Sequence, residues 1–344
     1  MMKKFAILIS LFLSVSCLTE EIIKIGDDTP VPVMNAQLHA GDTLHRVFLN
    51  LSRLDRVEPL NEAVVKVFVN DALAATAEWV EMEEIYSNSE YIFKADFNPG
   101  DRVRIEATKG SFHARAEVTV PPAPSILSVK YEKVQQGEEE LNFEYRYYVQ
   151  IEDASSEDSF YRISMDKDVI VENYYKDNPV PKITKSDTHY VSVYNSDEPV
   201  ISDGWMKEVE DDEDIMSLLS SLFMIENQFN IFTDERFRNE TYTLKLRSDN
   251  LGLVSDFDYA AERIVCNPTV NIRVNSMSFL EYRYLISLCN FDTVGTDVNF
   301  ISEPISLPSN VEGGIGFVSV ESSACYSIEM PSCEQDLRYY EANP

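Results

Sequence analysis

The sequence is poor in basic residues, histidine and glycine, and each shortage narrows the range of functions. Only 29 of the 344 residues are lysine or arginine, against 59 acidic residues, and the formal net charge is −30. Such a surface repels nucleic acids and anionic lipid headgroups. With only 11 glycines, the chain is unlike collagen or low-complexity sequences. We therefore exclude DNA and RNA as partners and expect a folded protein.

The residue patterns of common enzymes are also missing. The four histidines, His39, His45, His113 and His189, form no H-E-x-x-H motif, and the cysteines form no C-x-x-C motif. Neither a G-x-S-x-G elbow nor a Walker loop occurs. The acidic run 208–215 lacks the glycine and the alternating ligands of a calcium loop, so it predicts a solvated loop. We expect no enzyme, no cofactor and no metal site.

One apolar run stands at the beginning of the chain, in "FAILISLFLSVSCLTEE", Phe5 to Glu21. Lys3 and Lys4 precede nine residues of apolar character, and small residues lead to Cys17. Nine residues are too few for a helix that spans a hydrocarbon core of about 30 Å. The pattern predicts a secretory signal peptide over residues 1–16.

Cleavage before a cysteine resembles the processing of a bacterial lipoprotein, in which the thiol of Cys17 would carry the lipid. Acyl chains contribute about 0.8 kcal/mol per buried CH₂, so several chains anchor a protein firmly. Ordinary cleavage beside an unmodified cysteine is the alternative. Glu20 and Glu21 resemble the surface-export signal of Bacteroidota lipoproteins. We expect a tether over residues 17–27 and an outer-membrane protein that is lipid-anchored and faces the cell exterior.

Residues 28–122 carry the alternating pattern of short β-strands. In "SFHARAEVTV", five residues point to one side, namely Phe112, Ala114, Ala116, Val118 and Val120. Period-two alternation with polar turns is typical of an antiparallel sandwich. The prolines of "PPAP", residues 121–124, cannot continue a ladder and mark a domain boundary. The sequence predicts an N-terminal immunoglobulin-like β-sandwich.

Residues 123–344 are also rich in strand patterns but include a few short helices. "ELNFEYRYYVQIED" alternates over its whole length, as expected for a long strand. "DEDIMSLLSSLFMI" has helical spacing with acids in its first turn. "SFLEYRYLISLCN" opens with Ser278 and has Glu281 three residues later, which is a capping box. We expect a mainly β chain, with a larger β-rich domain after the sandwich.

Five features occur in one order and together resemble a known family. They are the lipoprotein cysteine, the domain ending in "TVPPAPSI", then "NIFTDERFRNETYTLKL", "SFLEYRYLISL" and "SEPISLPSNVEGGIGFVSV". This combination is similar to the Bacteroidota lipoprotein family called domain of unknown function 4249, over nearly the whole mature chain. Residues 150–225 show no close match. The resemblance implies an accessory protein of a TonB-dependent outer-membrane transporter, and it supplies no catalytic residues.

The segments that carry this resemblance also have a physical interpretation. Gly313, Gly314 and Gly316 in "SNVEGGIGF" predict a turn with positive φ that leads into a strand. Phe232 and Phe237 in "FTDERF" are expected in the core, around a turn. The tyrosines of "EYRYL" are expected at the core and its rim rather than in a sugar-binding platform.

Four cysteines remain besides Cys17, namely Cys266, Cys289, Cys325 and Cys333. An even number in an oxidising compartment permits disulfides, with three pairings. Cys325–Cys333 is the local choice and leaves Cys266–Cys289. Cys289 also lies on the apolar stripe of an expected helix, where a buried thiol is the alternative.

Two classes of function remain. The first is a non-catalytic accessory or ligand-binding partner of a TonB-dependent nutrient uptake system. Exposed aromatic residues would make its contacts, and the candidates are Trp79, Trp205, Tyr174 and Tyr175, each of which could equally belong to a core. The second is a structural or adhesive cell-surface protein of fimbrial or spacer type. The lack of a clear swapped donor strand favours the first.

Overall fold

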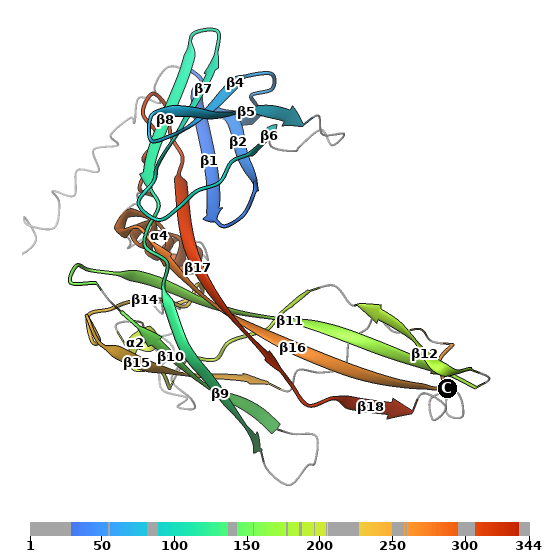
Figure 1. Cartoon of the computed structure of the whole chain (residues 1–344). Helices are drawn as coiled ribbons and strands as arrows, with labels where there is room; N and C mark the ends of the chain where they lie inside the picture. Colours follow the sequence, from blue (N-terminus) through green and yellow to red (C-terminus); the bar gives the residue numbers. More distant parts are fainter. Residues whose placement is uncertain are drawn as a thin grey trace, which may run out of the picture.

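The computed structural model describes most of the chain. The described residues are 29–53, 56–80, 89–136, 143–153, 155–176, 178–185, 188–195, 197–203, 205, 227–249, 258, 260–294 and 307–336. In this part the protein is mainly β, as the alternating sequence predicts (Figure 1). The signal peptide, Cys17, the acidic run 208–215 and the helix expected after it lie outside the described residues.

Eight strands form the first half of the molecule. They are β1 (Val31–Ala40), β2 (Leu44–Ser52), β3 (Val57–Pro59), β4 (Val64–Val69), β5 (Ala72–Val80), β6 (Ser89–Lys94), β7 (Arg102–Lys109) and β8 (Phe112–Thr119). Residues 72–77 of β5 pair with β4, and residues 78–80 pair with β6. β5 therefore connects two groups of strands. One group is β1, β2, β3 and β6, and the other is β4, β7 and β8.

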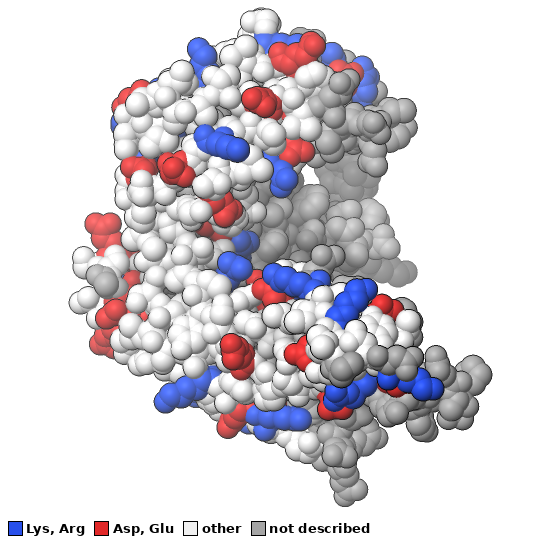
Figure 2. All heavy atoms as spheres, turned by 45° about the vertical axis from the view of Figure 1, so that its right-hand side comes forward, with Lys and Arg blue, Asp and Glu red and all other residues white. Residues whose placement is uncertain are grey.

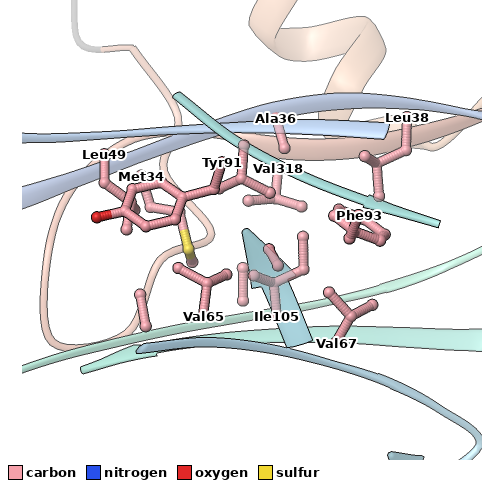
Figure 3. Close-up of a cluster of buried hydrophobic side chains, with 14 of the residues drawn as sticks. Met34, Ala36, Leu38, Leu49, Val65, Val67, Tyr91, Phe93, Ile105 and Val318 are labelled. Carbon is pink, nitrogen blue, oxygen red and sulfur yellow. The ribbon is translucent and has the colours of Figure 1, made fainter. Parts of the chain in front are cut away.

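The core of this half lies between the two groups (Figure 3). Leu38, Leu49 and Tyr91 project from one layer, while Val65, Val67 and Ile105 project from the other (labels in Figure 3). The predicted face of β8 is confirmed at its centre, because Ala114 and Ala116 are buried. Alternation therefore fixed which side of each strand enters the core.

The second half is built on longer strands. They are β9 (Ser125–Gln135), β10 (Phe143–Glu152), β11 (Phe160–Tyr175), β12 (Asn178–Lys185), β13 (His189–Tyr190), β14 (Ile231–Thr233), β15 (Thr241–Asp249), β16 (Arg263–Met277), β17 (Val318–Glu329) and β18 (Cys333–Asp336). The sheet β15-β10-β9 packs against β11 and β16 around a second core. Tyr147, Met165 and Ile272 are buried in it.

β11 and β16 continue well beyond this second core (Figure 1). We call their far part the arm, comprising residues 166–175 of β11, residues 263–271 of β16, β12, β13 and β18. β12 ends the order of the sheet, and it contains Pro181, which has no N–H for a ladder. An edge strand tolerates proline for this reason.

Two helices accompany the strands: α2 (Pro199–Ser202) and α4 (Phe279–Val294). The predicted cap of α4 is confirmed, since the amide of Glu281 donates to Ser278 Oγ at 3.1 Å. No helix within the described residues has the length and apolar character needed to cross a bilayer.

Acidic and basic side chains are interspersed over the face shown in Figure 2.

Candidate functional site

Strand β17 pairs with strands of both halves of the molecule. Residues 318–322 of β17 pair in parallel with β1, and residues 322–329 pair with β16. Ser322 takes part in both ladders, opposite Ala40 and Ser276. Its hydroxyl donates to the carbonyl oxygen of Pro121 at 2.7 Å, which attaches the proline segment to the same point. The junction is thus a structural element rather than a loose linker.

Polar side chains from five elements, three of them buried and two partly exposed, surround this crossing point. We call the set the junction cluster; it consists of His39, Arg162, Asn275, Glu281 and Glu321. Glu321 Oε2 accepts hydrogen bonds from Arg162 Nη2 at 2.8 Å and from Asn275 Nδ2 at 2.6 Å. His39 Nδ1 lies 3.4 Å from the same oxygen. The cluster therefore connects β1 to β11, β16 and β17.

Glu281 of α4 adds a second carboxyl to this cluster. Burial, and then the neighbouring Glu321 carboxylate, raise the pKa of Glu281 to about 8. Glu281 Oε2 and Glu321 Oε1 receive no hydrogen bond from any N–H or hydroxyl donor among the described residues. Because this pKa lies above neutrality, Glu281 is protonated near neutral pH and its hydroxyl donates to Glu321.

This carboxyl pair is not laid out for hydrolysis. Glycosidase carboxyls flank an open cleft that admits a sugar. Here the exposed fractions are 1% for Glu281 and 0% for Glu321, so no substrate reaches either group. Across the described ranges, no three His, Cys, Asp or Glu side chains are arranged to hold a metal ion. The cluster can position the halves and respond to pH, which is a structural role.

The glycine-rich segment explains how β17 reaches β1. Gly313 and Gly316 have φ values of +73° and +121°, as the sequence predicts. A Cβ on Gly314 would meet the carbonyl oxygen of Pro32, and one on Gly316 that of Met34. Only glycine permits this close approach to β1.

Two other segments singled out in the sequence contact this region or the second core. Tyr284 of α4 stacks on Phe317, with ring centroids 4.3 Å apart and planes 7° apart. Phe232 and Phe237 are 1% and 2% exposed, which confirms that both are core residues. The segments with the strongest resemblance to a family thus serve packing.

The four aromatic candidates for ligand contact do not form one surface. Trp79 packs on the first core and Trp205 on the cluster around Met277. The Tyr174 hydroxyl donates to Glu172 Oε2 at 2.7 Å, and the Tyr175 hydroxyl donates to Asp258 Oδ2 at 2.6 Å. The structure therefore brings only the two tyrosines near one another, at the end of β11.

The histidines offer no obvious general base either. His45 is buried, 3.0 Å from the carbonyl oxygen of Ala95 through Nε2, and its ring centroid lies 4.5 Å from that of Phe97. Burial lowers the pKa of His45, so the imidazole is neutral at physiological pH. This agrees with a histidine held within a strand layer.

The four cysteines among the described residues, Cys266, Cys289, Cys325 and Cys333, are thiols in this structure. Cys325 lies opposite Arg273 on β16, whereas Cys333 lies opposite Cys266. Arg273 and Cys266 are seven positions apart, which corresponds to about 23 Å along a strand. Disulfide bonds need Cα atoms within about 7 Å, so this register does not bring the locally favoured pair, Cys325 and Cys333, together.

The arm carries exposed apolar side chains that the sequence analysis did not single out. Ile183 and Tyr190 are 66% and 67% exposed, and Ile170 is 47% exposed. Ile183 lies opposite Glu172 of β11, and Tyr190 lies opposite Asp166. Positions 166, 170 and 172 of β11 differ by even numbers, so Ile170, Ile183 and Tyr190 lie on one face of the sheet. We call Ile170, Ile183 and Tyr190 the arm surface. Val180 on β12 is also 66% exposed.

One signal in the sequence could have identified part of this site. "NPVPKITK" combines prolines with apolar residues, which indicates an edge strand with uncovered side chains. Nothing local marks Glu321 or Arg162, because their contact joins residues far apart in sequence.

Comparison with known proteins agrees with the resemblance seen in the motifs. No curated protein matches the chain. One solved structure, the "Biofilm associated protein - B domain", aligns over 86% of this chain and 85% of its own at 7% identity and a TM-score of 0.13. Residues 19–326 match the family described as "Domain of unknown function (DUF4249)". The match covers most of the chain, and the protein therefore belongs to this family.

Proposed function

We propose that the protein is a non-catalytic lipoprotein on the outer-membrane surface that docks onto a TonB-dependent transporter through its arm. The arm surface is the observation that carries this proposal. Singly exposed apolar residues are ordinary, but Ile170, Ile183 and Tyr190 share one face of a projecting sheet. Large side chains of this kind supply most of the energy at protein interfaces.

The lipid on Cys17 and the immunoglobulin-like sandwich complete the proposal. In it, the lipid holds the first half near the membrane, and the sandwich spaces the arm from its anchor. Confinement to one membrane plane raises the effective concentration toward a neighbour in that plane. A small interface therefore suffices, and weak affinity in solution is consistent with docking.

The composition of β12 favours a different partner over self-assembly. Fimbrial assembly would add a strand to an open sheet edge. Pro181 interrupts the donors of this edge, and Lys182 and Lys185 are 62% and 68% exposed along it. Proline and lysine at an edge oppose strand addition. A structural or adhesive function is thus the second candidate.

A pull-down distinguishes the two candidates. The lipidated protein is crosslinked in cells, extracted in mild detergent and recovered with its partners. We expect a TonB-dependent barrel as the main partner, and the Ile183→Glu variant to lose it. The control Leu73→Glu changes an equally apolar side chain, 57% exposed on β5, and should retain it. Recovery of only further copies of the chain would overturn docking in favour of the structural role.

A further inference from the structure

Cys266 and Cys333 occupy directly opposite positions on two antiparallel strands of the arm. The register of β16 and β18 runs from Arg263 opposite Asp336 to Cys266 opposite Cys333. Opposite residues of antiparallel strands have Cα atoms about 4.5–5.5 Å apart. Disulfides form over Cα separations of about 4.4–6.8 Å. The backbone of this pair is therefore already placed for a bond between the two sulfur atoms.

The two thiols differ in their exposure and in their chemical surroundings. Cys266 is 2% exposed, packed with Val171 and Ile264, whereas Cys333 is half-buried. A hydrogen bond from the Cys266 thiol, with a smaller contribution from the Lys167 ammonium, lowers the pKa of Cys333 to about 6. The thiolate form, which is the nucleophile, therefore predominates at the more accessible sulfur at neutral pH.

The other two cysteines lie elsewhere in the fold. Cys325 lies opposite Arg273 on the neighbouring ladder. Cys289 belongs to α4, which begins after β16 has ended at Met277, whereas Cys266 lies near the start of β16. The chain thus provides two matched controls for the reactive pair.

We propose that Cys266 and Cys333 form a disulfide that fastens β18 to β16 in the arm. The oxidant is an exchangeable disulfide, either a small molecule or the oxidised dithiol of an oxidoreductase. The Cys333 thiolate attacks one sulfur of that disulfide and releases the other as a thiolate, which takes up a proton. The Cys266 thiol then loses its proton, attacks the mixed disulfide and releases the second thiol. The two cysteines are oxidised, and the reagent disulfide is reduced to two thiols.

The bond closes a chain segment around much of the second half. β18 has four residues and pairs with β16. A covalent link across residues 266–333 restricts the unfolded chain and prevents β18 from separating from β16. This inference does not depend on docking, because it concerns the internal structure of the arm.

Peptide mapping of the whole chain tests the pairing directly. Cleavage after glutamate puts each cysteine in a different peptide, namely 263–281, 282–312, 322–329 and 330–334. The reduced protein is treated with oxidised glutathione at neutral pH, remaining thiols are alkylated, and the unreduced digest is analysed by mass spectrometry. We expect peptide 263–281 linked to 330–334, with loss of two free thiols per chain.

The controls separate this pairing from unspecific oxidation. The Cys325→Ser and Cys289→Ser variants should keep the link between 263–281 and 330–334. The Cys333→Ser variant should leave Cys266 reduced, because its sulfur is buried. Peptides 322–329 and 330–334 found joined, or Cys266 and Cys333 both alkylated after oxidation of the folded protein, would overturn the proposal.

Discussion

The Glu281 carboxyl of α4 and the Glu321 carboxyl of β17 meet in the interior, where burial and the Glu321 carboxylate raise the pKa of Glu281 to about 8. The pair stands where the first and second halves join, beside the double pairing of Ser322. Ionising both carboxyls would place two negative charges next to each other away from water. Arg162 offsets one of them. The junction is therefore the part of the fold most sensitive to alkaline pH.

The proton on Glu281 makes the stability of the fold depend on pH. The pKa of Glu281 rises from an ordinary 4.5 to about 8 on folding. Between these values the folded protein keeps a proton that the unfolded chain has released, so unfolding becomes easier as pH rises. The contribution is complete below pH 4.5 and is lost through pH 8. The slope for one proton is about 1.4 kcal/mol per pH unit.

Glu281→Gln tests this dependence. Glutamine can donate to Glu321 and does not ionise, so we expect its free energy of unfolding to fall less between pH 6 and pH 8 than that of the wild type, by about 1 kcal/mol or more. Urea unfolding at several pH values measures this difference. Glu240→Gln, at an exposed carboxyl, is the control and should follow the wild type. An unchanged slope in Glu281→Gln would mean that folding does not raise the pKa of Glu281.

Gly316→Ala should disrupt the contact between β17 and β1. A Cβ at Gly316 meets the backbone of Met34, whereas Gly100, also at positive φ, has nothing within 4 Å of its Cβ position. Both alanine variants carry the cost of a positive φ, so their difference isolates the clash. We expect Gly316→Ala to be less stable than Gly100→Ala by about 2 kcal/mol. Equal unfolding midpoints would show that β17 can move away from β1 at little cost.

The first half should be stabilised by a segment from the end of the chain. Val311, Val318 and Val320 belong to its core, although they lie far beyond the expected boundary at residues 121–124. We expect a fragment of residues 28–122 to fold alone, and a version joined by a flexible linker to residues 307–322 to be more stable. Each buried valine contributes about 1.5 kcal/mol or more. Thermal unfolding followed by circular dichroism compares the two, and identical melting temperatures would contradict the shared core.

Local patterns in the sequence predicted local structure well. The alternation around Ala114 and Ala116 gave the buried face of β8, and Ser278 gave the start of α4. The partner of Glu281 differed from expectation, because its carboxyl lies against Glu321 and not in a reciprocal cap. Capping is local, whereas the contact with β17 depends on pairing between distant strands. Likewise, no periodicity could reveal that β17 pairs with both β1 and β16.

Removing the lipid attachment should release the protein from membranes. Cys17 is the expected site of lipid, and we expect the apolar run before it to be removed on processing. We expect Cys17→Ser to appear in the soluble fraction after cell lysis, while the wild type sediments with membranes. Immunoblotting of the two fractions after a high-salt wash measures this. Continued sedimentation of the variant would require another anchor.

Docking through the arm is tested most directly by site-specific photocrosslinking in living cells. A photoreactive amino acid replaces Ile183 on the arm surface or, as the matched control, Leu73 on β5. Both positions are exposed, so their difference reports which part of the molecule faces a partner. The account predicts that irradiation joins the Ile183 position to a TonB-dependent barrel and leaves the Leu73 position without it. Crosslinks to the barrel from Leu73 alone, or from neither position, would contradict the account.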